Sequence, residues 1–138
     1  MVDRVVMERR LRALLRLIEG LQRRFADMSL GAFLQDEDAQ LIAERLLHLA
    51  CEACIDMANH AIADRGAEQP ESYREAFVQL GKLGLVPPEL SATLQQVAAM
   101  RNILVHGYLA VDPAKVHEVI VHRLQDLERF AACMARLL

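Results

Sequence analysis

The sequence predicts an all-α protein, an up-down bundle of four long helices and one short helix. Three observations lead to this prediction. The composition is 54% hydrophobic but only 4% aromatic, Gly and Pro number six and four, and apolar residues recur at three- and four-residue spacing along most of the chain. Because 138 residues can bury one sizeable core, we expect residues 1–138 to form a single domain.

The first two helices are predicted from their apolar stripes and from an N-cap. The first should run from Asp3 to Phe25, with its stripe formed by Leu11, Leu14 or Leu15, Ile18, Leu21 and Phe25. The second should run to about Asp64, with Asp36 as N-cap and two acidic residues in the first turn, where the helix dipole favours them. Its apolar residues lie on more than one face, so this helix should be central or shared with another subunit.

Residues 65–71 combine Gly, Pro and charged residues, which is typical of a loop. Ser72 and Glu75 then form a capping box for the short helix, which should stop at Gly84.

Prolines mark the starts of the remaining two helices. Pro87 and Pro88 can open a helix that ends at Gly107. Asp112 and Pro113 form an N-cap and first-turn pair for the last helix, which carries a continuous apolar stripe as far as Met134.

Several protein classes are disfavoured. No apolar run approaches the roughly 18 to 20 residues of a membrane-spanning helix, and the Arg-rich start lacks the apolar core of a signal peptide, so we expect a soluble, cytoplasmic protein. An odd number of cysteines, three, argues against a disulfide framework. Cys51 and Cys54 are spaced as C-x-x-C, but without a second pair we expect reduced thiols in the core rather than zinc or redox ligands, and no metal site.

The net charge of −3 hides a basic N-terminal segment. Residues 1–25 hold seven arginines and three acids, a local net charge of +4. Arg9, Arg16 and Arg23 recur every seven residues with Arg12 beside them, which places them along one helix face. A solvated face is the simpler interpretation, and a surface that meets phosphates is the alternative.

The stretch RNILVHGY, residues 101–108, places Arg, His and Tyr in an apolar run. On an ideal helix Arg101 and His106 diverge by about 140°. They could converge if the helix ended at His106 and Gly107 took a left-handed conformation, or if two copies faced each other across a two-fold axis.

Such a pair suits the cleavage of a phosphodiester, because Arg binds phosphate and His titrates near neutral pH. In RNA the 2′-hydroxyl is an internal nucleophile, so a general base or acid and a cation suffice, without a metal. The alternative is structural: Arg101 could satisfy helix carbonyls or pair with an acid on a neighbouring helix, and His106 is favourable near a helix C-terminus in any case.

Several segments, in order, resemble the HepT family of toxins within the HEPN (higher eukaryotes and prokaryotes nucleotide-binding) superfamily. These segments are ACIDMANHAIADRG, PESYREAF, LGLVPPEL, MRNILVHGY and VHEVI, and the similarity covers roughly residues 36–130. The family signature is Arg, four residues, His, one residue, Tyr, which Arg101, His106 and Tyr108 match without a gap.

The resemblance implies a helical homodimer whose paired motifs line a cleft at the interface and act as a metal-independent endoribonuclease, the toxin of a type VII toxin–antitoxin system. Arg101 and His106 would be the catalytic pair, and Asn102 would help to position them. The implied partner is a minimal nucleotidyltransferase antitoxin (MntA), which uses ATP to transfer AMP onto Tyr108, whereas this chain needs no cofactor. AMP on Tyr108 would place bulk and the negative charge of its phosphate in a groove meant for RNA.

Asp56, Asn59 and His60 lie within about one turn of each other on the second helix. They could support the same cleft, or Asp56 and His60 could form a local i, i+4 pair. His48, His117 and His122 show no partner pattern and are expected on the surface or half-buried.

Two other functions remain open. One is a non-catalytic module that binds a nucleotide or docks onto a nucleotidyltransferase, with Arg101 holding a phosphate. The other is a helical dimer with a purely structural role.

Overall fold

The computed structural model describes residues 3–107 and 109–138, and these ranges contain helices and no strand. The three longest helices are α1 (Arg4–Phe25), α3 (Glu37–Asp64) and α5 (Pro88–His106). Four shorter ones complete the described fold: α2 (Leu30–Leu34), α4 (Tyr73–Lys82), α6 (Pro113–His122) and α7 (Leu124–Ala135). The predicted all-helical bundle is confirmed.

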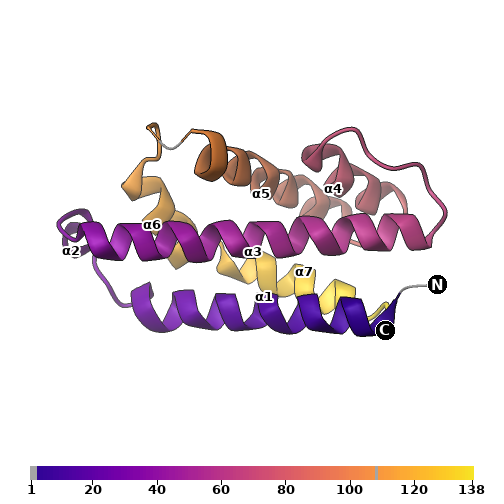
Figure 1. Cartoon of the computed structure of the whole chain (residues 1–138), viewed down its shortest axis with the longest axis horizontal. Coiled ribbons are helices and arrows are strands. Elements are labelled where there is room, and N and C mark those ends of the chain that lie inside the picture. The colour runs from indigo at the N-terminus through magenta and orange to yellow at the C-terminus, as the bar shows by residue number, and fades with distance from the viewer. Residues whose placement is uncertain (1–2, 108) are drawn as a thin grey trace.

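In Figure 1, α3 runs through the middle of the molecule, with α1 on one side and α4 and α5 on the other, while α6 crosses behind α3 and α7 is seen between α3 and α1. The C-terminus lies at the end of the bundle where α1 begins. The prediction that this long helix is central is therefore confirmed, and α3 packs against each of the other described helices.

Side-chain caps explain where most helices begin, because each satisfies a backbone N–H that the first turn leaves unpaired. The predicted caps Asp36, Ser72 and Asp112 accept from the N–H groups of Ala39, Glu75 and Ala114. Asp3 does the same for α1, which therefore begins one residue later than predicted, and Ser29 caps α2.

Two features of the chain trace were not predicted. The first is α2, a single short turn held by Ser29 and by the fully buried ring of Phe33. The second is a break in the last helix at Arg123, whose φ of −118° separates α6 from α7. The break follows a run rich in β-branched residues, Val119–Val121, which disfavour a helix.

The core is formed by apolar side chains from all seven helices, mainly Leu, Ala, Ile, Phe and Met. Cys51, Cys54 and Cys133 are free, buried thiols, which confirms the core interpretation of the C-x-x-C pair. On α3, however, the apolar side chains of Leu41 and Ile42 are 57% and 47% exposed. The first turns of α3 thus carry apolar side chains that this chain does not cover.

None of the helices in the described ranges is long and apolar enough to cross a membrane.

Candidate functional site

The C-terminal end of α5 carries the predicted motif. The helix continues to His106, and the N–H of Gly107 still bonds to the carbonyl of Ile103 at 2.9 Å. Gly107 has a φ of −101°, so the expectation of a left-handed glycine is wrong. A Cβ at Gly107 would come within 3.1 Å of the Ile103 carbonyl oxygen, so this tight helix end itself favours a glycine.

Arg101 and His106 meet within one chain. Nη1 of Arg101 lies 3.3 Å from Nε2 of His106. The backbone directions of the two residues diverge on an ideal helix, but the long arginine side chain reaches around the helix end to the imidazole. Neither a left-handed glycine nor a second copy of the chain is needed for this contact.

The guanidinium of Arg101 is held on several sides, and its side chain is only 15% exposed. Nε donates to Oε1 of Glu52 on α3 at 2.6 Å. The guanidinium carbon lies 4.8 Å from the centre of the Tyr73 ring, a cation–π contact with the start of α4. Nη1 is 3.5 Å from Oδ1 of Asn102, at the limit of a hydrogen bond. The site therefore draws on α3, α4 and α5.

A second histidine extends the cluster along α3. Nε2 of His48 lies 3.4 Å from Oε1 of Glu52, and Nδ1 of His48 lies 3.3 Å from Nη1 of Arg45. Arg45, His48 and Glu52 follow each other at three- and four-residue steps, so they share one face of α3. His48 is half-buried as expected, but it has the partners that the sequence pattern did not reveal.

The neighbours of the two histidines limit how their ring nitrogens can bond. An arginine can only donate hydrogen bonds, so Nε2 of His106 accepts from Arg101 in this contact. By the same rule Nδ1 of His48 accepts from Arg45, while Nε2 of His48 lies at an ion-pair distance of 3.4 Å from Oε1 of Glu52. His106 is exposed, so its basic nitrogen sits beside a fixed cation at the surface. This combination can bind a phosphate and remove a proton near it.

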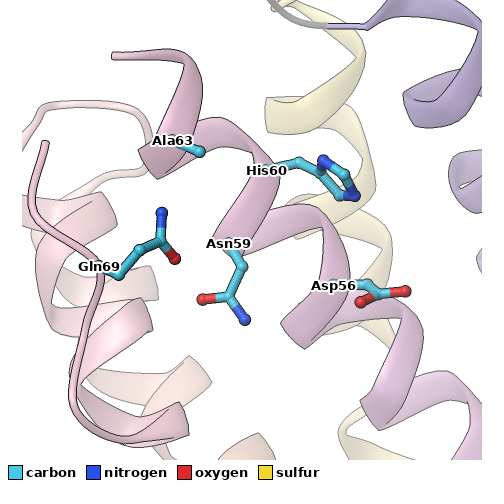
Figure 2. Close-up of a pocket in the computed structure, with 5 residues that line it drawn as sticks. All are labelled: Asp56, Asn59, His60, Ala63 and Gln69. Atoms are coloured by element: carbon cyan, nitrogen blue, oxygen red, sulfur yellow. The ribbon is translucent and has the colours of Figure 1, made fainter. Parts of the chain in front are cut away.

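The three polar residues predicted on the second helix do not contact Arg101 or His106. Asp56 accepts from Nε of Arg10 on α1 at 3.0 Å, and not from His60 as the local alternative supposed. A shallow pocket of about 220 Å³ is lined by Asp56, Asn59, His60, Ala63 and Gln69. Figure 2 shows Asn59 and Gln69 extending into the space between α3 and the loop that follows it, while Asp56 and His60 project from a neighbouring face of α3.

Two further predictions concern the motif and the basic segment. Tyr108 lies outside the described residues. Arg9, Arg12 and Arg16 are exposed on α1, and among the described residues no ion pair involves them, whereas Arg23 lies 3.9 Å from Glu19.

Sequence reasoning missed Glu52, His48 and Tyr73. Their contacts with Arg101, direct or through Glu52, join segments that are far apart along the chain. One signal was available: Glu52 is the one charged residue in the apolar stretch Leu49–Ile55. A charge that interrupts an apolar run of a helix points to a partner on a neighbouring element.

Comparison with known proteins adds an independent line of information. The family model described as "Ribonuclease HepT-like" matches residues 14–134. The chain is 35% identical over 125 residues to the tRNA nuclease HepT of Aphanizomenon flos-aquae, covering 91% of this chain and 84% of the relative. It is 36% identical over 115 residues to the mRNA nuclease HepT of Shewanella oneidensis, covering 83% and 85%.

Solved structures show the same fold. A tri-AMPylated HEPN toxin of Shewanella oneidensis in complex with an MNT antitoxin superposes with a TM-score of 0.88 at 32% identity, covering 99% of both chains. A toxin–antitoxin structure with AMP-PNP gives a TM-score of 0.85 at 31% identity, covering 97% of this chain and 99% of the other. With this likeness in sequence and fold over nearly its whole length, the chain belongs to the HepT-like ribonuclease family of HEPN proteins.

Proposed function

We propose that this chain is the toxin of a type VII toxin–antitoxin system, a metal-independent endoribonuclease of the cytoplasm with Arg101 and His106 as its catalytic pair. The contact of 3.3 Å between Nη1 of Arg101 and Nε2 of His106 carries this proposal, because it puts a phosphate-binding cation beside a basic nitrogen at the surface. Family membership and the nuclease relatives support it.

The geometry fits transesterification of RNA. When the substrate phosphate replaces Nε2 of His106 as the acceptor for Nη1 of Arg101, the lone pair of Nε2 is free, and it accepts the 2′-hydroxyl proton as the 2′-oxygen attacks the adjacent phosphorus. Nη1 and Nη2 of Arg101 neutralise the charge that builds on the non-bridging oxygens. The bond from phosphorus to the 5′-oxygen breaks, that oxygen leaves with a proton from water, and the products are a 2′,3′-cyclic phosphate and a 5′-hydroxyl.

Replacing His106 tests the activity. We expect His106→Ala to lower the rate of RNA cleavage by about 10²- to 10⁴-fold, the range for removal of a general base. The measurement is cleavage of labelled tRNA and mRNA, with analysis of the product ends. His122→Ala, which removes an exposed histidine of α6, is the matched control and should cleave at the wild-type rate. Cleavage by His106→Ala at the wild-type rate would exclude His106 as the base.

Asn102 and the pocket on α3 are proposed as supporting parts of the same site. Oδ1 of Asn102 is within 3.5 Å of Nη1 of Arg101 and can help to orient it. The pocket with Asp56, Asn59 and His60 begins one turn beyond Glu52 along α3, and its amide and imidazole groups can hydrogen-bond to a nucleotide next to the cleaved phosphate.

The chain is proposed to be neutralised by a minimal nucleotidyltransferase antitoxin that transfers AMP from ATP onto Tyr108. The relative solved with its MNT antitoxin is itself a tri-AMPylated HEPN toxin, which supports this assignment. Intact mass and peptide mapping of the chain, expressed alone and with such a partner, test it. Added AMP on Tyr108 only after co-expression is expected, and an unmodified Tyr108 beside an active partner would contradict it.

We also propose a homodimer in which two copies of the Arg101–His106 site face a common cleft. Leu41 precedes Arg45 by one turn on the same face of α3 and is 57% exposed, and its neighbour Ile42 is 47% exposed. A second copy of the chain would cover these side chains and bring its own cluster close to the first.

A further inference from the structure

Glu52 holds Arg101 from one particular edge. Its Oε1 bonds to Nε at 2.6 Å, whereas the contact with His106 is made by Nη1. A guanidinium has five N–H donors in a rigid plane, so a carboxylate on Nε leaves the four donors of the terminal nitrogens. Those of Nη1 face His106 and Asn102, contacts that a phosphate can replace, and those of Nη2 make no hydrogen bond among the described residues. Nη1 and Nη2 together form the fork that binds two oxygens of a phosphate.

We propose that Glu52, steadied by His48, is a positioning residue for RNA cleavage, because it fixes Arg101 with its terminal nitrogens directed to His106 and to the substrate phosphate. This inference rests on the proposed ribonuclease function. Glu52 itself touches neither His106 nor the reacting atoms, so it acts through Arg101.

The surroundings of Arg101 strengthen its ion pair with Glu52. The Arg101 side chain is 15% exposed, and an ion pair with one member so shielded from water is weakened less than one on the open surface. The guanidinium carbon also lies over the Tyr73 ring, 4.8 Å from its centre, and this cation–π contact favours the same position of Arg101. An arginine that is already oriented loses less conformational freedom when the phosphate reaches its transition state.

His48 also contacts Glu52. Nη1 of Arg45 donates to Nδ1 of His48 at 3.3 Å, and Nε2 of the same ring lies 3.4 Å from Oε1 of Glu52. Oε1 is therefore approached by two nitrogens, Nε2 of His48 on its own helix and Nε of Arg101 on α5. The side chains from Arg45 through His48, Glu52 and Arg101 to His106 thus form a continuous network of polar contacts between α3 and α5.

A purely structural role would be to tie α3 to α5, and the two roles differ in what they change. A structural tie affects the free energy of unfolding and leaves kcat of the folded protein unchanged. A positioning residue lowers kcat through Arg101, while KM and the folded fraction change little.

The test is the steady-state cleavage of a labelled RNA by Glu52→Gln and Glu52→Ala in the full-length chain. We expect kcat to fall by about tenfold to a hundredfold in Glu52→Ala, less in Glu52→Gln because the amide oxygen still accepts from Nε, and KM to stay within about threefold. Glu89→Gln is the matched control, because Glu89 pairs with Arg129 at 3.2 Å at the opposite end of α5. It should cleave like the wild type.

A double-mutant cycle with Arg101→Lys isolates the mechanism. If Glu52 acts through Arg101, Glu52→Ala should have little further effect on kcat in the Arg101→Lys background. Equal losses in both backgrounds, or wild-type kcat in Glu52→Ala, would overturn the proposal.

A readout without RNA separates this proposal from the proposed function. The Nε–H signal of Arg101 in ¹⁵N NMR should be resolved and slow to exchange in the wild type and lost in Glu52→Ala. If the wild type fails to cleave RNA, the proposed ribonuclease function is wrong. Independently of that result, an Nε–H signal that persists in Glu52→Ala would refute the positioning of Arg101 by Glu52.

Discussion

The thiols of Cys51 and Cys54 lie on the core side of α3, one and two residues along the sequence from Glu52 of the charged cluster. Burial, with a smaller contribution from the neighbouring Glu52 carboxylate, raises the pKa of the Cys51 thiol to about 12. Burial raises the pKa of the Cys54 thiol as well. Both side chains therefore stay protonated and unreactive at neutral pH, because the thiolate is the nucleophile.

We predict that a Cys133→Ala variant, which retains only these two thiols, reacts with Ellman's reagent at pH 8 at least about a hundredfold more slowly when native than in denaturant. The raised pKa of Cys51 belongs to the folded state, so its contribution to stability is complete below pH 9.0 and is lost as the pH rises toward about 12. Native labelling at the rate of an exposed thiol would contradict the burial of both residues.

The motif residues could be predicted from the sequence, and their arrangement only in part. Arg101 and His106 stand out because charged and titratable side chains interrupt an apolar run. The sequence could not show that Arg101 bridges to His106 within one chain, since that depends on the rotamer of a long side chain at the helix end. Glu52 and Tyr73 were missed because their approach to Arg101 is set by how α3, α4 and α5 pack.

Among the elements, α4 and α5 make an unusually close contact at Gly81. A Cβ added there would lie 2.6 Å from Oγ and 2.8 Å from Cβ of Ser91. Ser91 is buried and donates to the carbonyl of Phe77 at 2.7 Å, so it cannot turn away without leaving its own buried hydroxyl unpaired.

We predict that Gly81→Ala lowers the free energy of unfolding by about 1–3 kcal/mol, the usual cost of overpacking. Urea unfolding followed by circular dichroism measures it. Gly31→Ala is the matched control, because nothing lies within 4 Å of the added Cβ in α2, and it should be neutral or stabilising by up to about 1 kcal/mol. Equal stabilities of Gly81→Ala and the wild type would show that α4 and α5 can separate freely.

Helix starts were predictable because a cap is a local interaction. Asp36, Ser72 and Asp112 each bond to a backbone N–H two or three residues ahead, so a short window of sequence contains the whole signal. The helix α2 was missed because its five residues are too few for a periodic pattern, and its place depends on Phe33 packing against Phe25 and His117.

For the whole molecule, the central place of α3 was predicted from its apolar residues on several faces, and the exposed side chains at its start were not. Leu41 and Ile42 look like core residues in the sequence, yet no helix of the described chain covers them. The sequence pattern reports that a face is apolar, and it cannot say whether the same chain or a second one covers it.

The homodimer provides the prediction for the whole molecule. We expect the wild type to sediment as a dimer at micromolar concentration, and Leu41→Lys to weaken the dimer by about tenfold to a hundredfold in Kd, because a charge would enter an apolar contact. Leu15→Lys is the matched control, since Leu15 is 46% exposed on α1, and its Kd should equal that of the wild type. Analytical ultracentrifugation across a dilution series measures both variants.

The same dilution series tests whether RNA cleavage requires the dimer. If two copies of the Arg101–His106 cluster form one cleft, RNA cleavage by Leu41→Lys should fall at low protein concentration and recover as the concentration rises above its Kd. Cleavage that follows monomer concentration would instead show that each chain acts alone, which the contact of 3.3 Å between Arg101 and His106 within one chain would permit. A wild type that is monomeric at micromolar concentration would contradict the dimer itself and leave Leu41 and Ile42 available to another protein.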